Sequence, residues 1–314
     1  MTALVLTAGG ARGAYQAGVM KRISEIPAFV DQAAPFSIIT GASAGAINGA
    51  AIASQHDNFG VASKLLVKLW ASLEANTVYR SDAFAMMKNA ASLALDFGLG
   101  GLVGAGRVKS LVDSSPLYAF LNQNLKLDGI RRAVKEGGLY ALGITATGYH
   151  TGRAFTFVEG KPGHPLWSKS RRVALPAEIT LPHVLASAAI PIVFPPVELP
   201  AGAASAFFGD GAMRLVTPLS PAIRLGADRL LAVGVRCQES ANSLLRSEWS
   251  QDADFAPNLK RPPLSQICGT LMNAIFLDHL DSDLDHLKRM NSFVAEHEKL
   301  ASLVDLVAES DSDH

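Results

Sequence analysis

Ser43 stands in the sequence GASAG, between Gly41 and Gly45, after an apolar run and before a string of small residues. A serine on a sharp turn between a strand and a helix forms a nucleophile elbow, whose hydroxyl attacks a carbonyl carbon. The two glycines permit the turn and a close approach of neighbouring strands, where a Cβ would collide. The start of the following helix favours developing negative charge. An ordinary N-cap serine would occupy the same position, so this segment alone leaves both interpretations open.

A second segment that could take part in catalysis is TAGGARGAYQAG, residues 7–18, which also follows a strand and opens a helix. If the first two strands are neighbours, the backbone amides around Gly9 and Gly10 lie beside Ser43 and suit a tetrahedral oxyanion. Arg12 would add a fixed positive charge or brace the loop. Dinucleotide binding is the rival interpretation. The segment lacks the G-x-G-x-x-G register, an acidic residue after the second strand and the lysine of a P-loop.

Asp210 lies between two glycines in FFGDGAM, directly after an apolar strand. A plain Asp-Gly turn has the same pattern. Ser43 needs a base, however, and only His150 and His183 lie in suitable loops, whereas three other histidines fall on a late helix: His279, His286 and His297. The order Ser–Asp–His of the α/β-hydrolases is formally possible, but that fold has several strands before its nucleophile and here only one precedes it. A two-member Ser–Asp site fits better.

Composition narrows the classes of function. The chain has 314 residues, 49% of them apolar, and its 28 Lys and Arg balance 28 Asp and Glu. Such a balance gives no global reason to bind nucleic acid. Cys237 and Cys268 lie far apart, which suits a reducing cytosol and two ordinary buried thiols. The N-terminus lacks a basic segment and a long apolar run, so it is predicted to be a first strand of a soluble, cytoplasmic protein. No cluster of metal ligands is visible, and no metal or cofactor is expected.

Apolar strands alternate with helices along the chain, which predicts a largely parallel sheet covered on both faces. The expected strands are residues 3–7, 36–40, 139–147, 153–158, a segment ending at 209, and 228–235. The expected helices are residues 15–26, 44–53 and 62–73, followed by a helical region over 264–293. The sequence GYHTG between the third and fourth strands predicts a hairpin.

Together these segments resemble the patatin-like phospholipase family. Four ordered segments carry the resemblance: AGGARG (8–13), GASAG (41–45), ASAAIPIVFPPV (186–197) and DGA (210–212). The hairpin over 144–157 is also typical of the family, and order and spacing agree over about residues 1–235. One departure is Ala8, which replaces the first glycine of the usual triple. Ala8 belongs to the end of the first strand, so its presence weakens the oxyanion assignment little.

The resemblance implies an α/β fold, a three-layer α/β/α arrangement with a mostly parallel central sheet, in a single domain over residues 1–314. The catalytic segments would lie within 1–235, with a helical segment, 262–300, packed on them. It also implies that Ser43 is the nucleophile and Asp210 the general base and acid, acting through an acyl-enzyme. The implied oxyanion hole consists of Gly9, Gly10, Ala11, Arg12 and Gly13. Supporting motif glycines are Gly41, Gly45 and Gly211.

The implied substrate is a lipid acyl ester, such as a phospholipid or a lysophospholipid, with at most transient peripheral contact to a membrane. Residues 83–108 combine methionine, phenylalanine and five glycines, which suits either a lid over an acyl groove or a buried helix with a glycine-rich connection. KSRR at 169–172 either steers an anionic headgroup or ends a solvated loop. Two rival functions stay open: an acyltransferase that uses the same serine intermediate, and a non-catalytic interaction protein with the same fold.

Overall fold

The computed structural model describes residues 1–80, 110, 112–202, 204–235, 270 and 279–311. The candidate lid over 83–108, Cys237 and Cys268 lie outside these ranges. No helix in the described part of the chain is both long enough and apolar enough to cross a membrane.

A single eight-stranded sheet forms the centre of the protein, with the order β5-β4-β3-β2-β1-β8, β7 paired with β3, and β6 with β7. The strands are β1 (Thr2–Leu6), β2 (Ile38–Ala42), β3 (Ala141–Gly148), β4 (Arg153–Gly160), β5 (Arg172–Pro176), β6 (Val197–Ala201), β7 (Ala204–Gly209) and β8 (Arg229–Val233). The strands of the core, β3-β2-β1-β8, run parallel. Leu6 lies opposite Gly41, which confirms that the first two strands are neighbours.

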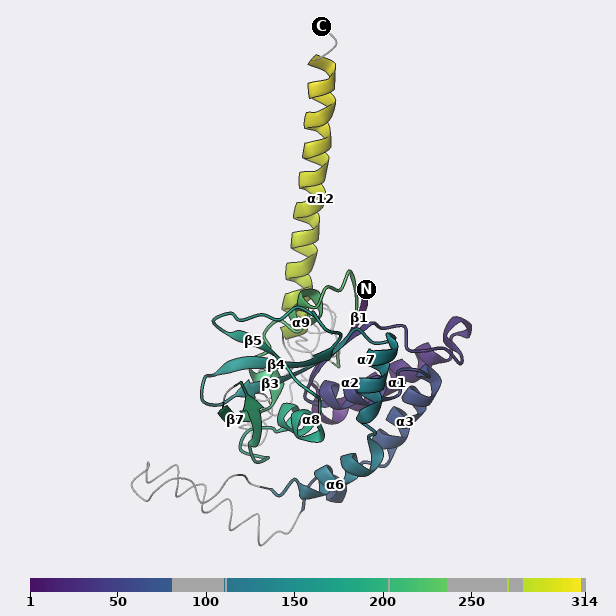
Figure 1. Ribbon diagram of the computed structural model, residues 1–314, viewed down its shortest axis with the longest axis vertical. Helices are drawn as coiled ribbons and strands as arrows, with labels where there is room; N and C mark the ends of the chain where they lie inside the picture. The colour runs from purple at the N-terminus through teal and green to yellow at the C-terminus, as the bar shows by residue number, and fades with distance from the viewer. Residues whose placement is uncertain (81–109, 111, 203, 236–269, 271–278, 312–314) are drawn as a thin grey trace, which may run out of the picture.

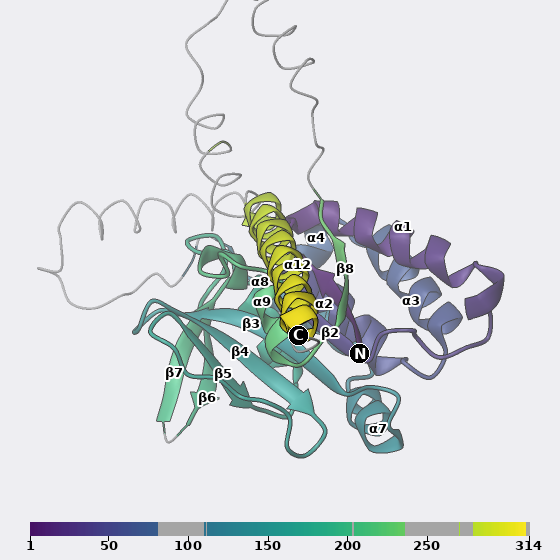
Figure 2. The same ribbon diagram turned by 90° about the horizontal axis from the view of Figure 1, so that it is seen from above.

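Helices cover both faces of the sheet, as the alternation of side chains in β1 shows. Leu4 and Leu6 point into a core shared with α2, whereas Ala3 and Val5 pack on the side of Leu219 in the turn before α9. The helices are α1 (Gly13–Ser24), α2 (Ala44–Ser54), α3 (Phe59–Ala71), α4 (Ala75–Val78), α6 (Ser115–Asn124), α7 (Asp128–Glu136), α8 (Leu181–Ala188), α9 (Ser220–Arg224) and α12 (His279–Asp311). The predicted three-layer α/β/α architecture is confirmed, and Figures 1 and 2 show α1, α2 and α3 together on one side.

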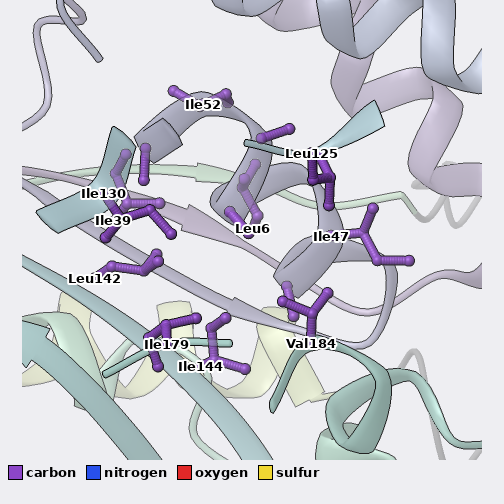
Figure 3. Packing of buried hydrophobic residues seen from close by; sticks show 14 of the residues in the cluster. Leu6, Ile39, Ile47, Ile52, Leu125, Ile130, Leu142, Ile144, Ile179 and Val184 are labelled. Carbon is purple, nitrogen blue, oxygen red and sulfur yellow. The ribbon is translucent and has the colours of Figure 1, made fainter. Parts of the chain in front are cut away.

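Helix α2 is the innermost helix, because every one of its residues is buried. Its alanines and glycines let it approach the sheet closely: a Cβ on Gly49 would lie 3.2 Å from Cγ2 of Ile39. Figure 3 shows Ile47 and Ile52 of α2 in the same apolar cluster as Leu6 and Ile39. The helix that begins at the candidate nucleophile is therefore held firmly by the core.

Several elements differ from the sequence expectation. Strand β2 continues to Ala42, and β5 and β6 were not predicted, because β5 ends and β6 nearly ends in proline and both carry a charged residue. The β3–β4 hairpin is confirmed, and β6 and β7 form a further antiparallel hairpin that was not predicted. Helix α12 runs to Asp311, and Figure 1 shows it leaving the body of the protein. Leu280, Leu284 and Leu287 at its start pack against the core, whereas Phe293 is 65% exposed.

Candidate active site

Ser43 occupies a strained turn between β2 and α2. Its backbone has φ 55° and ψ −124°, a conformation that L-residues adopt only when the surroundings enforce it. The enforcing contacts are visible at the flanking glycines. A Cβ on Gly41 would collide with the Gly45 carbonyl, and one on Gly45 with the Leu6 carbonyl of β1. Ser43 stands at the N-cap position, but its side chain makes no capping hydrogen bond, so capping does not explain the residue.

The hydroxyl of Ser43 instead points to a carboxylate. Its Oγ donates a hydrogen bond to Oδ2 of Asp210 at 2.6 Å. Ser43 is 5% exposed and Asp210 is 0% exposed, so the pair lies almost entirely out of water. The backbone N–H of Ser43 donates to Oγ of Ser187 on α8 at 2.9 Å, and Ser187 donates on to the Thr145 carbonyl of β3 at 2.6 Å. The backbone of the candidate nucleophile is thus tied to the neighbouring strand.

Asp210 reaches Ser43 by a route that the sequence did not predict. We expected Asp210 directly after an apolar strand of a largely parallel sheet, but β7 runs antiparallel to β3 and pairs with β3 only at Thr147 and Gly148. Beyond β7, the Asp210 carbonyl accepts a hydrogen bond from Thr147 Oγ1 at 2.8 Å, and Ala212 N–H donates to Oδ1 at 2.9 Å. Gly211 is required beside it, because a Cβ there would collide with the Thr145 carbonyl. Both carboxylate oxygens are therefore fixed in direction.

Burial sets the proton affinity of this carboxylate. Because desolvation disfavours the charged form, it raises the pKa of Asp210 to about 7, although hydrogen bonds from Ser43 and Ala212 act in the opposite direction. Burial also raises the pKa of the nearby Tyr149, and the negative charge of Asp210 adds to that effect. A carboxylate with a pKa near neutrality is a much stronger base than an exposed one.

The glycine-rich loop after β1 brings backbone amides to the same place. Gly10 and Ala11 line a cavity together with Ser43. The amides of Arg12 and Gly13 are used inside the loop, where they donate to the carbonyls of Gly9 and Gly10. No partner for the amides of Gly10 and Ala11 is found in the described part of the chain. Arg12 is exposed and has no ion-pair partner among these residues.

The cavity beside Ser43 has a volume of about 440 Å³ and is mainly apolar. The loop Gly10–Arg12 and the start of α2 form one side of it. Its other lining residues come from α1, α2, α3, the segment between α3 and α4, α4, α6, the end of α8 and the segment after it: Ala14, Ile47, Trp70, Leu73, Glu74, Ala75, Val78, Leu117, Ala188, Ile190 and Phe194. Glu74 is the one charged residue among these lining residues, and the others offer mainly hydrocarbon surface. The arrangement suits an extended apolar group whose reacting end meets Ser43.

Comparison with known proteins agrees with this geometry. The family model described as "Patatin-like phospholipase" matches residues 4–223. The chain belongs to this family. The match covers all four segments on which the sequence resemblance rests, and the resemblance is confirmed.

Wider searches add little to the family assignment. No curated protein matches this patatin-like chain at a significant level. Among solved structures, VipD from Legionella pneumophila matches 78% of this chain and 52% of its own, with 16% identity and a TM-score of 0.40. A structure of full-length SpcU in complex with full-length ExoU from Pseudomonas aeruginosa matches 51% of this chain and 35% of that chain, with 16% identity and a TM-score of 0.26. The chain thus spans about half and about a third of these proteins, and neither score supports an argument on function.

The histidines of this patatin-like protein do not serve the Ser–Asp pair within the described residues. Burial lowers the pKa of His183 to about 4, and its Nδ1 accepts a hydrogen bond from the Thr180 backbone at the start of α8. His150 packs against an aromatic ring at the hairpin tip. Neither hydrogen-bonds to Ser43 or Asp210. In the same ranges, no group of three or more His, Cys, Asp or Glu is arranged to hold a metal ion.

Two supporting residues of this site, Ser187 and Thr147, were not predicted from the sequence. Ser187 lies inside the segment 186–197 that carries the family resemblance, yet its role depends on contacts with Ser43 and Thr145, far away in the sequence. Thr147 was assigned only to a strand. The sequence feature that could have identified both residues is a hydroxyl side chain in an otherwise apolar, buried segment, because a buried hydroxyl needs a hydrogen-bond partner. Such a signal identifies the residue but not the partner.

Proposed function

We propose that this protein is a serine acyl hydrolase that cleaves lipid acyl esters, with Ser43 as nucleophile and Asp210 as the base. The observation that carries the proposal is the 2.6 Å hydrogen bond from Ser43 Oγ to the buried Asp210 carboxylate, on a strained turn. A serine held this way, without a histidine between it and the carboxylate, is primed for direct proton transfer.

In the first half of the reaction, Ser43 Oγ attacks the ester carbonyl carbon and its proton moves to Oδ2 of Asp210. The carbonyl oxygen becomes an oxyanion, which the amides of Gly10 and Ala11 and the start of α2 stabilise. The bond from carbon to the leaving oxygen then breaks. Asp210 returns the proton to that oxygen, so an alcohol leaves and Ser43 carries the acyl group.

In the second half, water attacks the acyl-enzyme and gives one proton to Asp210. The same amides stabilise the second oxyanion. Its collapse breaks the bond to Ser43 Oγ, which regains the proton from Asp210, and a carboxylic acid is released. Removing one oxyanion donor typically lowers the rate by about 10²–10³, so the amides of Gly10 and Ala11 supply a large part of the acceleration.

The apolar cavity supports a lipid as the acyl donor. Ile47, Leu117, Ile190 and Phe194 offer hydrocarbon contacts to a fatty acyl chain, and family membership makes a phospholipid or a lysophospholipid the substrate class to test first. Transient contact with a lipid surface is part of this proposal, because such a chain must leave a membrane or micelle to enter the cavity.

A fluorophosphonate probe tests the proposal, because it reacts only with an activated serine. Intact-protein mass is measured for the wild type, Ser43→Ala and Asp210→Asn. We expect one adduct on the wild type, none on Ser43→Ala, and slower labelling of Asp210→Asn. Ser54→Ala is the matched control, since Ser54 ends α2 and, among the described residues, its Oγ hydrogen-bonds only to the Ala51 carbonyl.

No adduct on a folded wild type would overturn the proposal and leave a non-catalytic member of the family. If labelling succeeds, product analysis on a panel of lipid esters follows. Free fatty acid as the acyl product supports a hydrolase. Transfer to an added alcohol in preference to water would identify an acyltransferase instead.

A further inference from the structure

Three polar side chains from three helices, two of them fully buried and one partly buried, form one chain of hydrogen bonds next to the glycine-rich loop. They are Gln16 on α1, Asn48 on α2 and Trp70 on α3. Gln16 and Asn48 are 0% exposed. Trp70 Nε1 donates to Asn48 Oδ1 at 2.7 Å, and Asn48 Nδ2 donates to Gln16 Oε1 at 2.8 Å. The proposed reaction uses none of these side chains.

The direction of the hydrogen bonds in this network follows from the chemistry of Trp70. An indole N–H can only donate, so the oxygen of Asn48 must face Trp70 and its NH₂ group must face away. That NH₂ group donates to Gln16 Oε1 and to the Gly13 carbonyl at 3.0 Å. The NH₂ group of Gln16 must then face the opposite side, where it donates to the carbonyls of Thr7 at 2.9 Å and Val233 at 2.8 Å. A fully satisfied buried network of this kind specifies one arrangement.

The backbone carbonyls that accept hydrogen bonds from this network show which segment of the protein the network holds in place. The Thr7 and Gly13 carbonyls flank residues 8–12, which include Gly10 and Ala11. Asn48 lies on the helix that begins at Ser43. The network therefore connects both ends of the loop to the helix of the nucleophile. Packing reinforces the connection, because a Cβ on Gly13 would lie 2.6 Å from Trp70 Cζ2.

We infer that Gln16, Asn48 and Trp70 are positioning residues that keep the amides of the loop aligned with Ser43. This inference rests on the proposed function for its catalytic consequence. Trp70 also lines the cavity, so the same side chain contacts the site of the acyl group and orients the network. A displacement of about 1 Å in a catalytic group can lower a rate by about 10², which makes a rigid connection valuable.

The kinetic test uses Asn48→Leu, Trp70→Phe and the double variant, with a short-chain nitrophenyl ester as substrate. We expect kcat to fall by about 10- to 100-fold in Asn48→Leu, with KM changed by less than about threefold, because alignment matters most in the transition state. Trp70→Phe removes the indole donor and part of the ring that packs on Gly13, but it leaves the Asn48–Gln16 hydrogen bond in place and should lower kcat less. If the residues act in series, the double variant is no slower than Asn48→Leu.

Ser63→Ala is the matched control. Ser63 Oγ and Ser24 Oγ form a buried hydrogen bond of 2.7 Å between the same two helices, α1 and α3, away from the loop. This variant should lose stability but keep kcat within about twofold of the wild type. Equal losses of kcat in Ser63→Ala and Trp70→Phe, or additive losses in the double variant, would overturn the inference.

Hydrogen exchange measured by mass spectrometry tests the inference without requiring catalytic turnover. We expect faster exchange in peptides covering residues 8–13 for Asn48→Leu and Trp70→Phe, and wild-type exchange there for Ser63→Ala. Unchanged exchange in both network variants would overturn the inference even if the enzyme is active. A wild type that cleaves no ester would instead refute the proposed function, while the exchange data still decide whether the network holds the loop.

Discussion

Asp210→Asn should make the protein less active and, above neutral pH, more stable. The folded protein raises the pKa of Asp210 from 3.8 to about 7, because the carboxyl is buried. Between these two values, the folded state keeps a proton that the unfolded state releases. The free energy of unfolding must therefore fall as the pH rises through this window. Asparagine keeps the shape of the side chain and has no proton to lose. The variant therefore lacks this pH-dependent fall in the free energy of unfolding.

The size of the effect follows from the shift. Each pKa unit corresponds to about 1.4 kcal/mol. For pKa values of 3.8 in the unfolded state and about 7 in the folded state, the free energy of unfolding of the wild type falls by on the order of 3 kcal/mol between pH 5 and pH 8.5. Total stabilities of domains are typically about 5–15 kcal/mol, so the loss is readily measurable. No discount for solvent screening applies, because the carboxyl is fully buried.

Urea unfolding at pH 5 and pH 8.5 measures this difference for the wild type and for Asp210→Asn. The comparison of the two pH-dependences cancels the contributions of all other titrating groups. Asp57→Asn, at an exposed carboxylate on the surface, is the control and should follow the wild type. If Asp210→Asn loses as much stability as the wild type between the two pH values, Asp210 does not have a raised pKa and the reasoning is wrong.

Three further predictions concern catalysis and packing. The kcat/KM for ester hydrolysis should rise about tenfold per pH unit up to about pH 7 and then level off, since only ionised Asp210 is a base; a profile that levels off near pH 4 would contradict the assignment. Ser187→Ala removes the acceptor of the Ser43 N–H and should lower kcat by about tenfold, which corresponds to one ordinary hydrogen bond; an unchanged kcat would show that the elbow holds without it. Gly45→Ala should fail to fold or unfold at a much lower temperature, because its Cβ collides with backbone, whereas Gly18→Ala, in open space on α1, should gain about 0.5–1 kcal/mol in thermal unfolding; equal effects would refute the packing argument.

The sequence predicted the local parts of the site well, because their chemistry is local. A glycine pattern around Ser43, an apolar run before it and small residues after it specify a strand, a sharp turn and a buried helix without reference to the rest of the chain. The pairing of the first two strands, which the oxyanion interpretation took as its condition, is present in the fold. These parts depend on steric limits at neighbouring residues, and such limits can be inferred from residue types alone.

The parts that could not be predicted depend on long-range pairing. The direction of β7 cannot be inferred from its sequence, because an apolar strand before Asp210 has the same pattern in either orientation. Gln16 donates to a carbonyl 217 residues away, and no local pattern identifies that acceptor. A polar residue on a predicted buried helix indicates only that some partner must exist. The identity of the partner is a property of the completed fold.

The glycines on both sides of Asp210 explain how, in the proposed reaction, a carboxylate serves as the base without a histidine. An exposed carboxyl has a pKa near 4 and is too weak to take a proton from serine efficiently. A Cβ on Gly209 would collide with the Tyr149 hydroxyl, and one on Gly211 with the Thr145 carbonyl, so the absence of side chains lets these groups close over the carboxyl. Closure removes water, and the loss of water raises the pKa to about 7. The Asp-Gly pattern that resembles a plain turn in the sequence therefore raises the basicity of Asp210 in the folded protein, as the proposed proton transfer from Ser43 requires.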